Sequence, residues 1–149
     1  MIYCDTSFLG ALYLPEEVFE PVARTISAAW EISIPFPWLT EIELCNAVYR
    51  GLGRKLYDKG TCVAVLRQIS ADKAAGILSP RLLESAVLFK GAMDLSKRFT
   101  AIHRCRTLDI LHVVAALEFK ANALASFDSR QRQLALSVGL DLLPESIPT

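Results

Sequence analysis

Four acidic residues of this 149-residue chain lie where predicted strands end or predicted helices begin. Asp5 and Asp128 each follow a predicted strand directly, whereas Glu43 and Asp109 each lie near the first turn of a predicted helix. Carboxylates that share one site repel each other unless a cation neutralises them. Mg²⁺ or Mn²⁺ suits such an all-oxygen site, and these ions can activate a water for hydrolysis of a phosphodiester. If the four acids converge, this is the chemistry that they favour.

Each acid also has a purely structural interpretation. Asp5 and Asp128 could cap the helices that follow them, and Thr40-x-x-Glu43 matches the pattern of a capping box. Asp109 could simply favour the positive end of its helix. A cap contributes only about 1 kcal/mol, and nothing in the local sequence requires the four acids to meet. Both interpretations therefore stay open at the level of single residues.

The elements that would position these acids follow an α/β pattern. We predict short strands at 2–4, 32–34, 123–127 and 140–143, with a further candidate at 77–78, and helices at 8–14, 16–30, 39–52, 62–76, 82–99, 108–120 and 130–138. Pro35 and Pro37 are expected to end the second strand. The glycines expected to end helices are Gly51, Gly53, Gly76 and Gly139. Strands that alternate with helices in this way indicate a parallel sheet, whose ligands bind where its strands end.

Composition limits the classes of protein that fit. The length predicts one domain over 1–149, and 52% hydrophobic with 21% charged residues excludes wholesale disorder. Sixteen basic and sixteen acidic residues cancel, which argues against a protein held to nucleic acid by bulk charge. We see no signal peptide and no membrane span, so we expect a soluble cytoplasmic protein. The four cysteines form no CxxC pair and are expected to be reduced thiols that pack as small hydrophobes.

The segments around the acids resemble those of the PIN-domain ribonucleases, most closely the VapC-type toxins of prokaryotic toxin–antitoxin pairs. They are Ile2-Tyr3-Cys4-Asp5-Thr6-Ser7, Glu43-Leu44-Cys45-Asn46-Ala47, Arg106-Thr107-Leu108-Asp109-Ile110-Leu111-His112 and Ser126-Phe127-Asp128. The resemblance spans essentially the whole chain. It implies a three-layer α/β/α fold with a parallel sheet of four or five strands and extra helices in the middle. It also implies an endoribonuclease dependent on Mg²⁺ or Mn²⁺, whose catalytic and metal-binding acids are Asp5, Glu43, Asp109 and Asp128.

Five further residues are candidates for supporting roles. Ser7 matches a small polar residue of the family, and Ser126 stands where Thr is more common; either hydroxyl could hold an acid or a bound water. Asn46 follows Glu43 by three residues and could hydrogen-bond within the pocket. Arg106 could hold the acids in position or bind a phosphate; the alternative is that it forms a surface ion pair. His112 is expected mainly to hold nearby groups of the structure.

The charged residues around the quartet have weaker assignments. Glu41 lies about 200° around the helix from Glu43, so we expect it to face solvent. Six basic residues could flank the acids and hold an RNA backbone, although a solvated charged face explains them equally: Arg98, His103, Arg104, Arg106, Arg130 and Arg132.

The resemblance also implies partners. An RNA substrate, an antitoxin segment lying in an apolar groove of the middle helices, and a second copy in a homodimer are expected. The alternative function is a non-catalytic PIN-like scaffold that binds partners. A signalling receiver domain fits less well, because no Lys directly follows Asp128.

Overall fold

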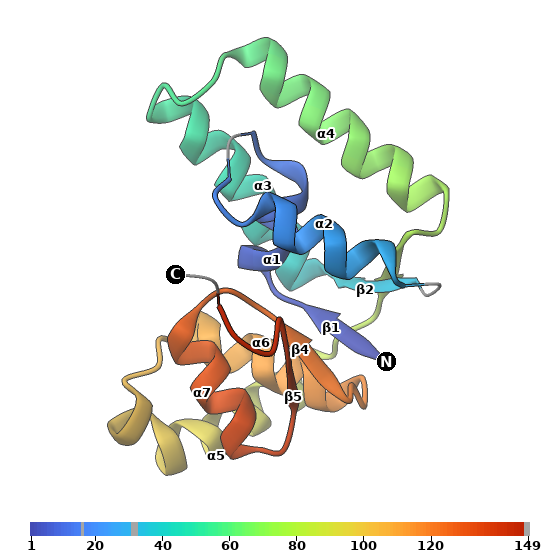
Figure 1. Cartoon of the computed structure of the whole chain (residues 1–149). Coiled ribbons are helices and arrows are strands. Elements are labelled where there is room, and N and C mark those ends of the chain that lie inside the picture. Colours follow the sequence, from blue (N-terminus) through green and yellow to red (C-terminus); the bar gives the residue numbers. More distant parts are fainter. Residues whose placement is uncertain (16, 31–32, 148–149) are drawn as a thin grey trace. The chain divides into compact units, whose positions relative to one another are not determined.

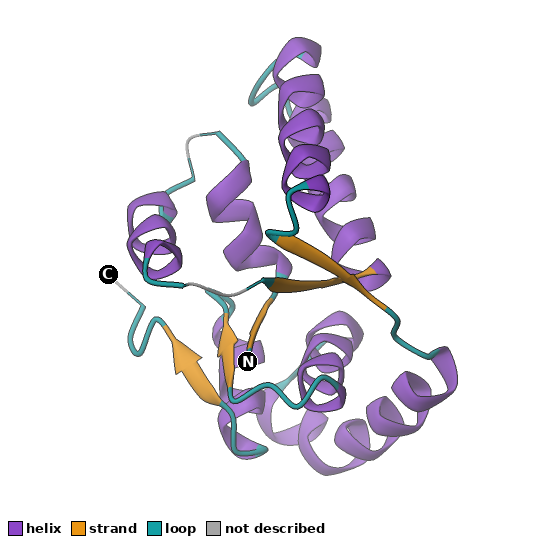
Figure 2. Cartoon of the chain, turned by 90° about the vertical axis from the view of Figure 1, so that its right-hand side faces the viewer, coloured by secondary structure: helices purple, strands orange, loops and turns teal. Residues whose placement is uncertain are grey.

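The computed structural model describes residues 1–15, 17–30 and 33–147, which form two compact units. The first unit combines Met1–Asp5 with the chain from Leu82 onward, and the second unit is Thr6–Arg81. Figure 1 follows the chain through both units, and Figure 2 shows the strands of each unit as orange arrows. Each unit has its own parallel sheet. The single domain predicted over 1–149 stays a prediction.

The first unit contains a three-stranded parallel sheet with helices packed beside it. Its elements are β1 (Ile2–Cys4), α5 (Ser85–His103), α6 (Thr107–Glu118), β4 (Ala123–Ala125), α7 (Ser129–Ser137) and β5 (Asp141–Leu143). The strand order is β1-β4-β5, with Cys4 opposite Ala125 and Ala125 opposite Leu143. Because β1 and β4 are parallel and end in register, the residues that follow them, Asp5 and Ser126, emerge at the same edge of the sheet.

The second unit is mainly helical. Its elements are α1 (Thr6–Tyr13), α2 (Glu20–Ala28), β2 (Ile34–Pro37), α3 (Trp38–Gly53), α4 (Lys59–Ala74) and β3 (Leu78–Arg81). Strands β2 and β3 pair in parallel, from Ile34 opposite Leu78 to Pro37 opposite Arg81. Helix α3 starts directly after β2, so the end of this strand sets where Glu43 lies along the helix.

The α/β fold class with a parallel sheet is confirmed, although the described strands form one sheet of three and one sheet of two instead of a single sheet of four or five. The second strand is short as predicted, because β2 ends at Pro37. It continues through Pro35, which does not interrupt it. The N–H of Ile34 donates to the carbonyl oxygen of Ile77 on the side of β3. Since N–H groups alternate along a strand, the nitrogens of both prolines point away from β3, so no ladder hydrogen bond is lost. Residue 32, the first residue of the strand predicted from the sequence, lies outside the described residues.

Two of the predicted glycine stops are confirmed at positive φ. Gly76 (φ 76°) follows α4 and Gly139 (φ 85°) follows α7, in a conformation that favours glycine after a helix. The prediction for Gly51 was wrong, because α3 continues to Gly53. A Cβ at Gly51 would collide with the ring of Tyr57, whose hydroxyl donates to the carbonyl oxygen of Val48 (2.9 Å). This close approach explains the glycine better than a helix end does.

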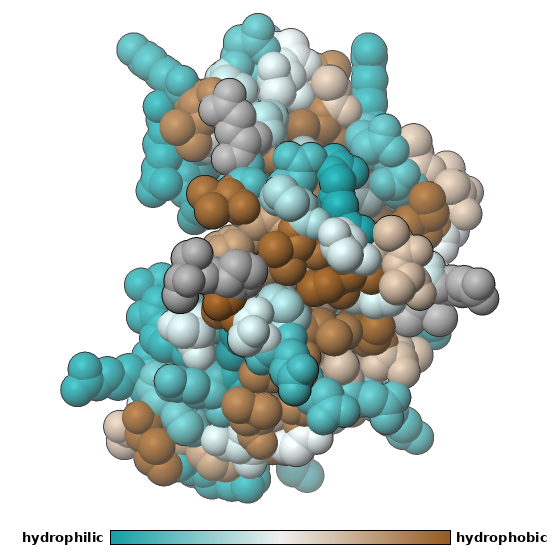
Figure 3. Space-filling view, viewed as in Figure 1, coloured by the Kyte–Doolittle hydropathy of each residue, from teal (hydrophilic) through white to brown (hydrophobic). Residues whose placement is uncertain are grey.

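Apolar side chains fill both units and also remain at the surface. Tyr3 and Leu124 in the first unit, and Phe36 and Leu44 in the second, are at most 1% exposed. Figure 3 shows apolar residues among hydrophilic ones over one face of the molecule. Among the described residues, the structure contains no helix long and apolar enough to cross a membrane.

All four cysteines are free thiols, and Cys4, Cys62 and Cys105 are buried as expected, whereas Cys45 is exposed and does not pack as a small hydrophobe. Burial raises the pKa of Cys4 and of Cys105, and neighbouring carboxylates raise both further. The nucleophilic thiolate is therefore scarce at these two positions near neutral pH. We predict that iodoacetamide modifies the native protein at Cys45 alone, and the unfolded protein at all four positions.

Mass spectrometry of modified peptides measures this pattern. A Cys45→Ser variant should take up no label in the native state. Modification of Cys4, Cys62 or Cys105 in the native protein at the rate of Cys45 would contradict their buried positions.

Helices α5 and α6 approach each other closely at Gly91. A Cβ built at this position would lie 2.6 Å from the Cγ1 of Val114, which is 2% exposed. A Cβ at Gly53 meets no atom within 4 Å. Overpacking a core typically costs about 1–3 kcal/mol. We therefore predict that Gly91→Ala is less stable than Gly53→Ala by about this amount in denaturant unfolding, and equal stability of the two variants would contradict the tight contact.

Candidate functional site

The hydroxyl of Ser126 connects two of the predicted acids. It donates to Oδ2 of Asp5 (2.7 Å) and accepts from the backbone N–H of Asp128 (3.1 Å). Asp5 is 2% exposed and Ser126 is fully buried. The N–H of Asp5 also donates to the carbonyl oxygen of Ala125 (3.0 Å), which extends the β1–β4 pairing by one residue. The edge of the sheet thus positions both side chains.

Asp128 begins helix α7. Its Oδ1 accepts from the backbone N–H groups of Arg130 (2.9 Å) and Gln131 (3.1 Å), so the cap predicted for this residue is confirmed. The cap does not exclude a metal-binding role, because a carboxylate can accept hydrogen bonds with one oxygen and bind a cation with the other. Strand β4 ends at Ala125 rather than at Phe127 as predicted, which leaves Ser126 and Asp128 in the connection to α7.

Asp109 is the third residue of α6 and is 7% exposed. Its Oδ2 accepts from the backbone N–H of Arg106 (2.7 Å), which lies just before the helix. This bond satisfies one of the amides that a helix N-terminus leaves without a partner. Asp109 therefore has a structural role at the start of α6, and this role is compatible with its being a candidate metal ligand.

Two of the candidate aspartates, Asp109 and Asp128, affect the pKa of the Cys105 thiol. Burial is the main cause that raises the pKa of this thiol, and the negative charges of both aspartates raise it further. The positive charge of Arg130 acts in the opposite direction. Charges act on a buried group over short distances most strongly, so both aspartates and Arg130 belong to the electrostatic environment of one thiol.

Arg132 is a structural residue rather than an RNA-binding one. It is 7% exposed, and its guanidinium donates to the carbonyl oxygens of Ser126 (2.9 Å), Pro144 (2.8 Å) and Glu145 (3.1 Å). Burial lowers its pKa, while the charge of Asp5 opposes this effect. Arg132 therefore ties the chain after β5 to the end of β4, and the expectation that it contacts RNA was wrong.

The fourth predicted acid, Glu43, lies in the second unit. Its Oε2 accepts from the hydroxyl of Thr6 (2.7 Å), the residue that directly follows Asp5. The predicted Thr40–Glu43 capping box was wrong, because α3 begins at Trp38 and Thr40 lies buried inside its first turn. Helix α3 follows β2 without an intervening turn, so its first residue lies two positions before Thr40.

The two candidate supporting residues Ser7 and Asn46 differ in exposure. Ser7 is half-buried, and Asn46 is exposed on α3. Glu41 pairs with Lys73 of α4 at 2.5 Å, and its side chain is 46% exposed. Glu41 therefore faces solvent only in part, and Lys73 compensates its charge.

His112 is buried in the core of the first unit at 1% exposure. Its Nδ1 lies 2.8 Å from the hydroxyl of Tyr3, and the two rings are 5.8 Å apart. A buried histidine that shares a hydrogen bond with a buried tyrosine links α6 to β1. This geometry supports the structural role that we expected for His112.

Sequence reasoning missed Thr6 and Cys105. Thr6 could have been found from its place beside Asp5 in the first segment, but its hydrogen bond to Glu43 joins residues far apart in the sequence. Cys105 directly precedes Arg106, and only the folded chain shows that two aspartates influence its thiol.

The chemistry of the donor set fits a hard divalent cation. Asp5, Asp109 and Asp128 offer carboxylate oxygens, the ligands that Mg²⁺ and Mn²⁺ prefer. The described residues contain no group of three or more His, Cys, Asp or Glu side chains placed close enough to hold a metal ion. Within the first unit, Ser126 hydrogen-bonds to the carboxylate of Asp5 and to the backbone N–H of Asp128, whereas Asp109 is held separately by the N–H of Arg106.

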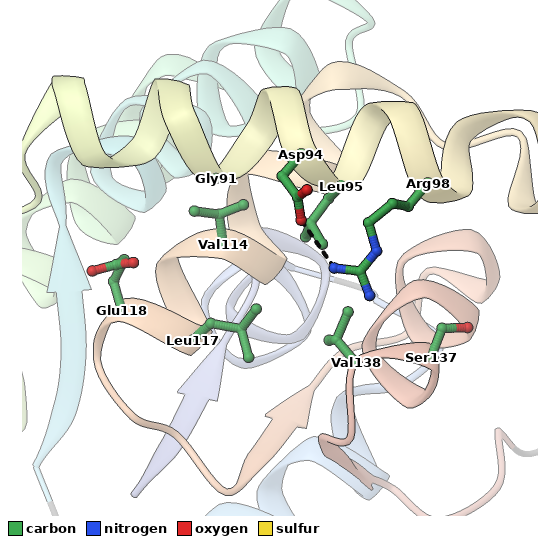
Figure 4. A pocket seen from close by; sticks show the side chains of 9 residues that line it. All are labelled: Gly91, Asp94, Leu95, Arg98, Val114, Leu117, Glu118, Ser137 and Val138. Atoms are coloured by element: carbon green, nitrogen blue, oxygen red, sulfur yellow. Dashed lines mark hydrogen bonds and ion pairs between the residues drawn. The ribbon is translucent and has the colours of Figure 1, made fainter.

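A hollow of about 410 Å³ lies elsewhere in the first unit, between α5, α6 and α7. Figure 4 shows that an ion pair between Asp94 and Arg98 (2.9 Å) borders this hollow, with Leu117 and Val138 among its apolar residues. None of the predicted site residues lines it.

Comparison with known proteins identifies the family. A family model for the PIN domain matches residues 2–136. A comparison with curated proteins found no match. Among solved structures, the chain is similar to Mycobacterium tuberculosis VapC20, a toxin that cleaves the sarcin–ricin loop. The TM-score is 0.72 at 16% sequence identity, over 99% of this chain and 100% of the toxin chain, which shows a shared fold. Since the family model covers almost the whole chain, this protein belongs to the PIN domain family.

Proposed function

We propose that this protein is a metal-dependent endoribonuclease that hydrolyses phosphodiesters in single-stranded or looped RNA. The observation that carries the proposal is the buried Ser126 hydroxyl, which holds Asp5 (2.7 Å) and the N–H of Asp128 (3.1 Å) in a chain of the PIN domain family. This hydroxyl joins the carboxylate of Asp5 to the backbone of Asp128 and so brings the two residues together at one edge of the sheet.

Asp5, Asp109 and Asp128 would hold Mg²⁺ or Mn²⁺ together with Glu43. The support for including Glu43 is Thr6, which is covalently joined to Asp5 and donates to the Glu43 carboxylate (2.7 Å). Consecutive Cα atoms are about 3.8 Å apart, so this hydrogen bond links Glu43 to the chain beside Asp5. Ser7 and Asn46 stay predictions as supporting residues.

When bound, such an ion lowers the pKa of a water and stabilises the charge of the leaving oxygen. The chain's own contribution is to hold the carboxylates in fixed orientations. Ser126 orients Asp5, the N–H of Arg106 orients Asp109, and the first amides of α7 orient Asp128. Such outer hydrogen bonds keep ligands in place before the substrate binds.

The likeness to VapC20, itself a toxin, supports a finer proposal. We propose that this chain is the toxin of a VapBC-type pair in the cytoplasm, that an antitoxin segment silences it, and that it forms a homodimer. The alternative is a PIN-like scaffold without catalysis. Binding of Mn²⁺ discriminates between the two, because a scaffold has no need of an intact group of carboxylates.

We predict that removing one negative charge from the quartet abolishes RNA cleavage. Asp109→Asn and Glu43→Gln should each lower the rate on total cellular RNA with Mn²⁺ by about 100-fold or more, because each removes a charge that a cation requires. Glu41→Gln is the matched control for Glu43→Gln. It lies two residues away on α3, pairs with Lys73 and should keep the wild-type rate.

Mapping the cut ends measures both rate and position of cleavage. Circular dichroism confirms that each variant folds. If folded Glu43→Gln and Glu41→Gln cut RNA equally well, Glu43 has no place in the site. If the wild type itself leaves RNA intact with Mn²⁺, the proposed activity is wrong.

We further predict that the Ser126 hydroxyl supports metal binding. Ser126→Ala removes the donor to Asp5 and the acceptor for the N–H of Asp128, so it should weaken Mn²⁺ binding by about 10–100-fold in calorimetric titration. Ser126→Thr keeps the hydroxyl and should restore most of the affinity. Equal Mn²⁺ affinity in Ser126→Ala and the wild type would show that this hydroxyl serves folding only.

A further inference from the structure

Two arginines of the first unit, Arg106 and Arg130, donate backbone hydrogen bonds to the carboxylates of Asp109 and Asp128. The backbone N–H of Arg106 donates to Oδ2 of Asp109 (2.7 Å), and the backbone N–H of Arg130 donates to Oδ1 of Asp128 (2.9 Å). Both side chains therefore start beside a proposed metal ligand. Arg106 is exposed and Arg130 is half-buried.

Neither arginine is neutralised by a carboxylate within the described part of the chain. The ion pairs found there are Arg24–Glu20, Lys73–Glu41 and Arg98–Asp94. The backbones of Arg106 and Arg130 are thus hydrogen-bonded to acids with which their side chains form no ion pair in the described residues. Cationic side chains in this position are available to another anion.

The substrate of the proposed reaction is such an anion. A phosphodiester that approaches Asp5, Asp109 and Asp128 meets three negative charges, and positive charge nearby lowers this repulsion. Guanidinium groups suit the task, because their planar fork of N–H donors matches phosphate oxygens.

We propose that Arg106 and Arg130 bind backbone phosphates of the RNA strand beside the aspartates and so position the bond to be cut. This inference rests on the proposed nuclease function and adds the residues that hold its substrate. Contacts to phosphates carry no sequence information, so both arginines should contribute equally to RNAs of different sequence.

Two other arginines of the unit do not fit this role. Arg132 is buried and donates to three carbonyl oxygens. Arg98 pairs with Asp94, as Figure 4 shows, and its guanidinium stacks 4.8 Å from the ring centre of Phe99. Arg98 is therefore a matched control, because its loss changes the net charge equally without removing an unpaired cation.

The test measures binding of a fluorescein-labelled single-stranded RNA by anisotropy, in EDTA and over a range of KCl concentrations. Arg106→Gln and Arg130→Gln should each reduce the slope of log Kd against log [KCl] by about 0.7, and the double variant by about twice that. Arg98→Gln should keep the wild-type slope. The losses should be the same for two RNAs of unrelated sequence.

Kinetics with Mn²⁺ give a second measurement. Arg130→Gln should raise KM for RNA with a smaller change in kcat, since phosphate contacts away from the reacting atoms act mainly on binding. Arg130→Lys keeps the charge without the planar fork and should recover part of the affinity.

The outcomes separate this inference from the function on which it rests. A wild type that neither binds nor cuts RNA overturns both. A wild type that binds and cuts RNA, with Arg106→Gln and Arg130→Gln unchanged in slope and KM, overturns only the arginine proposal. Equal losses in Arg98→Gln would assign the effect to bulk charge and overturn it as well. If the variants keep the wild-type RNA affinity but no longer bind a protein that copurifies with the wild type, the two arginines belong to a protein interface and the proposal is wrong.

Discussion

The candidate site depends on one buried hydroxyl. Ser126 has no exposed surface, donates to Asp5 at 2.7 Å and accepts from the N–H of Asp128 at 3.1 Å. A buried hydroxyl with both roles satisfied has a fixed orientation, and loss of either partner leaves a polar group without compensation. The parallel pairing of β1 and β4 brings Asp5 and Ser126 to one edge. The carbonyl oxygen of Ser126 is held in turn by Arg132 (2.9 Å).

Buried negative charge is the second constraint on this unit. Asp5 and Asp109 are 2% and 7% exposed, and a charged group in such surroundings requires hydrogen bonds or an opposite charge. Backbone amides supply part of this compensation at Asp109 and Asp128. In the reaction that we propose, a divalent cation and the side chains of Arg106 and Arg130 would add positive charge beside these aspartates.

The parts of the site that follow from local sequence were predictable. The placement of Asp5 and Asp128 after strands needs only hydrophobic runs that stop at polar residues, and the cap at Asp128 follows from the helix after it. Long-range bonds were not predictable, because the bond from Thr6 to Glu43 joins α1 to α3 without a local signal. The continuation of β2 through Pro35 was not predictable for a related reason. Proline weakens a strand only where its nitrogen faces a partner, and this depends on pairing that the sequence does not specify.

The central proposal is that Asp5, Glu43, Asp109 and Asp128 bind a common divalent cation. Anomalous scattering from crystals soaked in Mn²⁺ tests it most directly, because it locates the ion without reference to activity. The account predicts a peak coordinated by these carboxylates, directly or through water, that is absent from crystals of Asp109→Asn. A Mn²⁺ peak at another place, or carboxylates that face different directions around no ion, would contradict it.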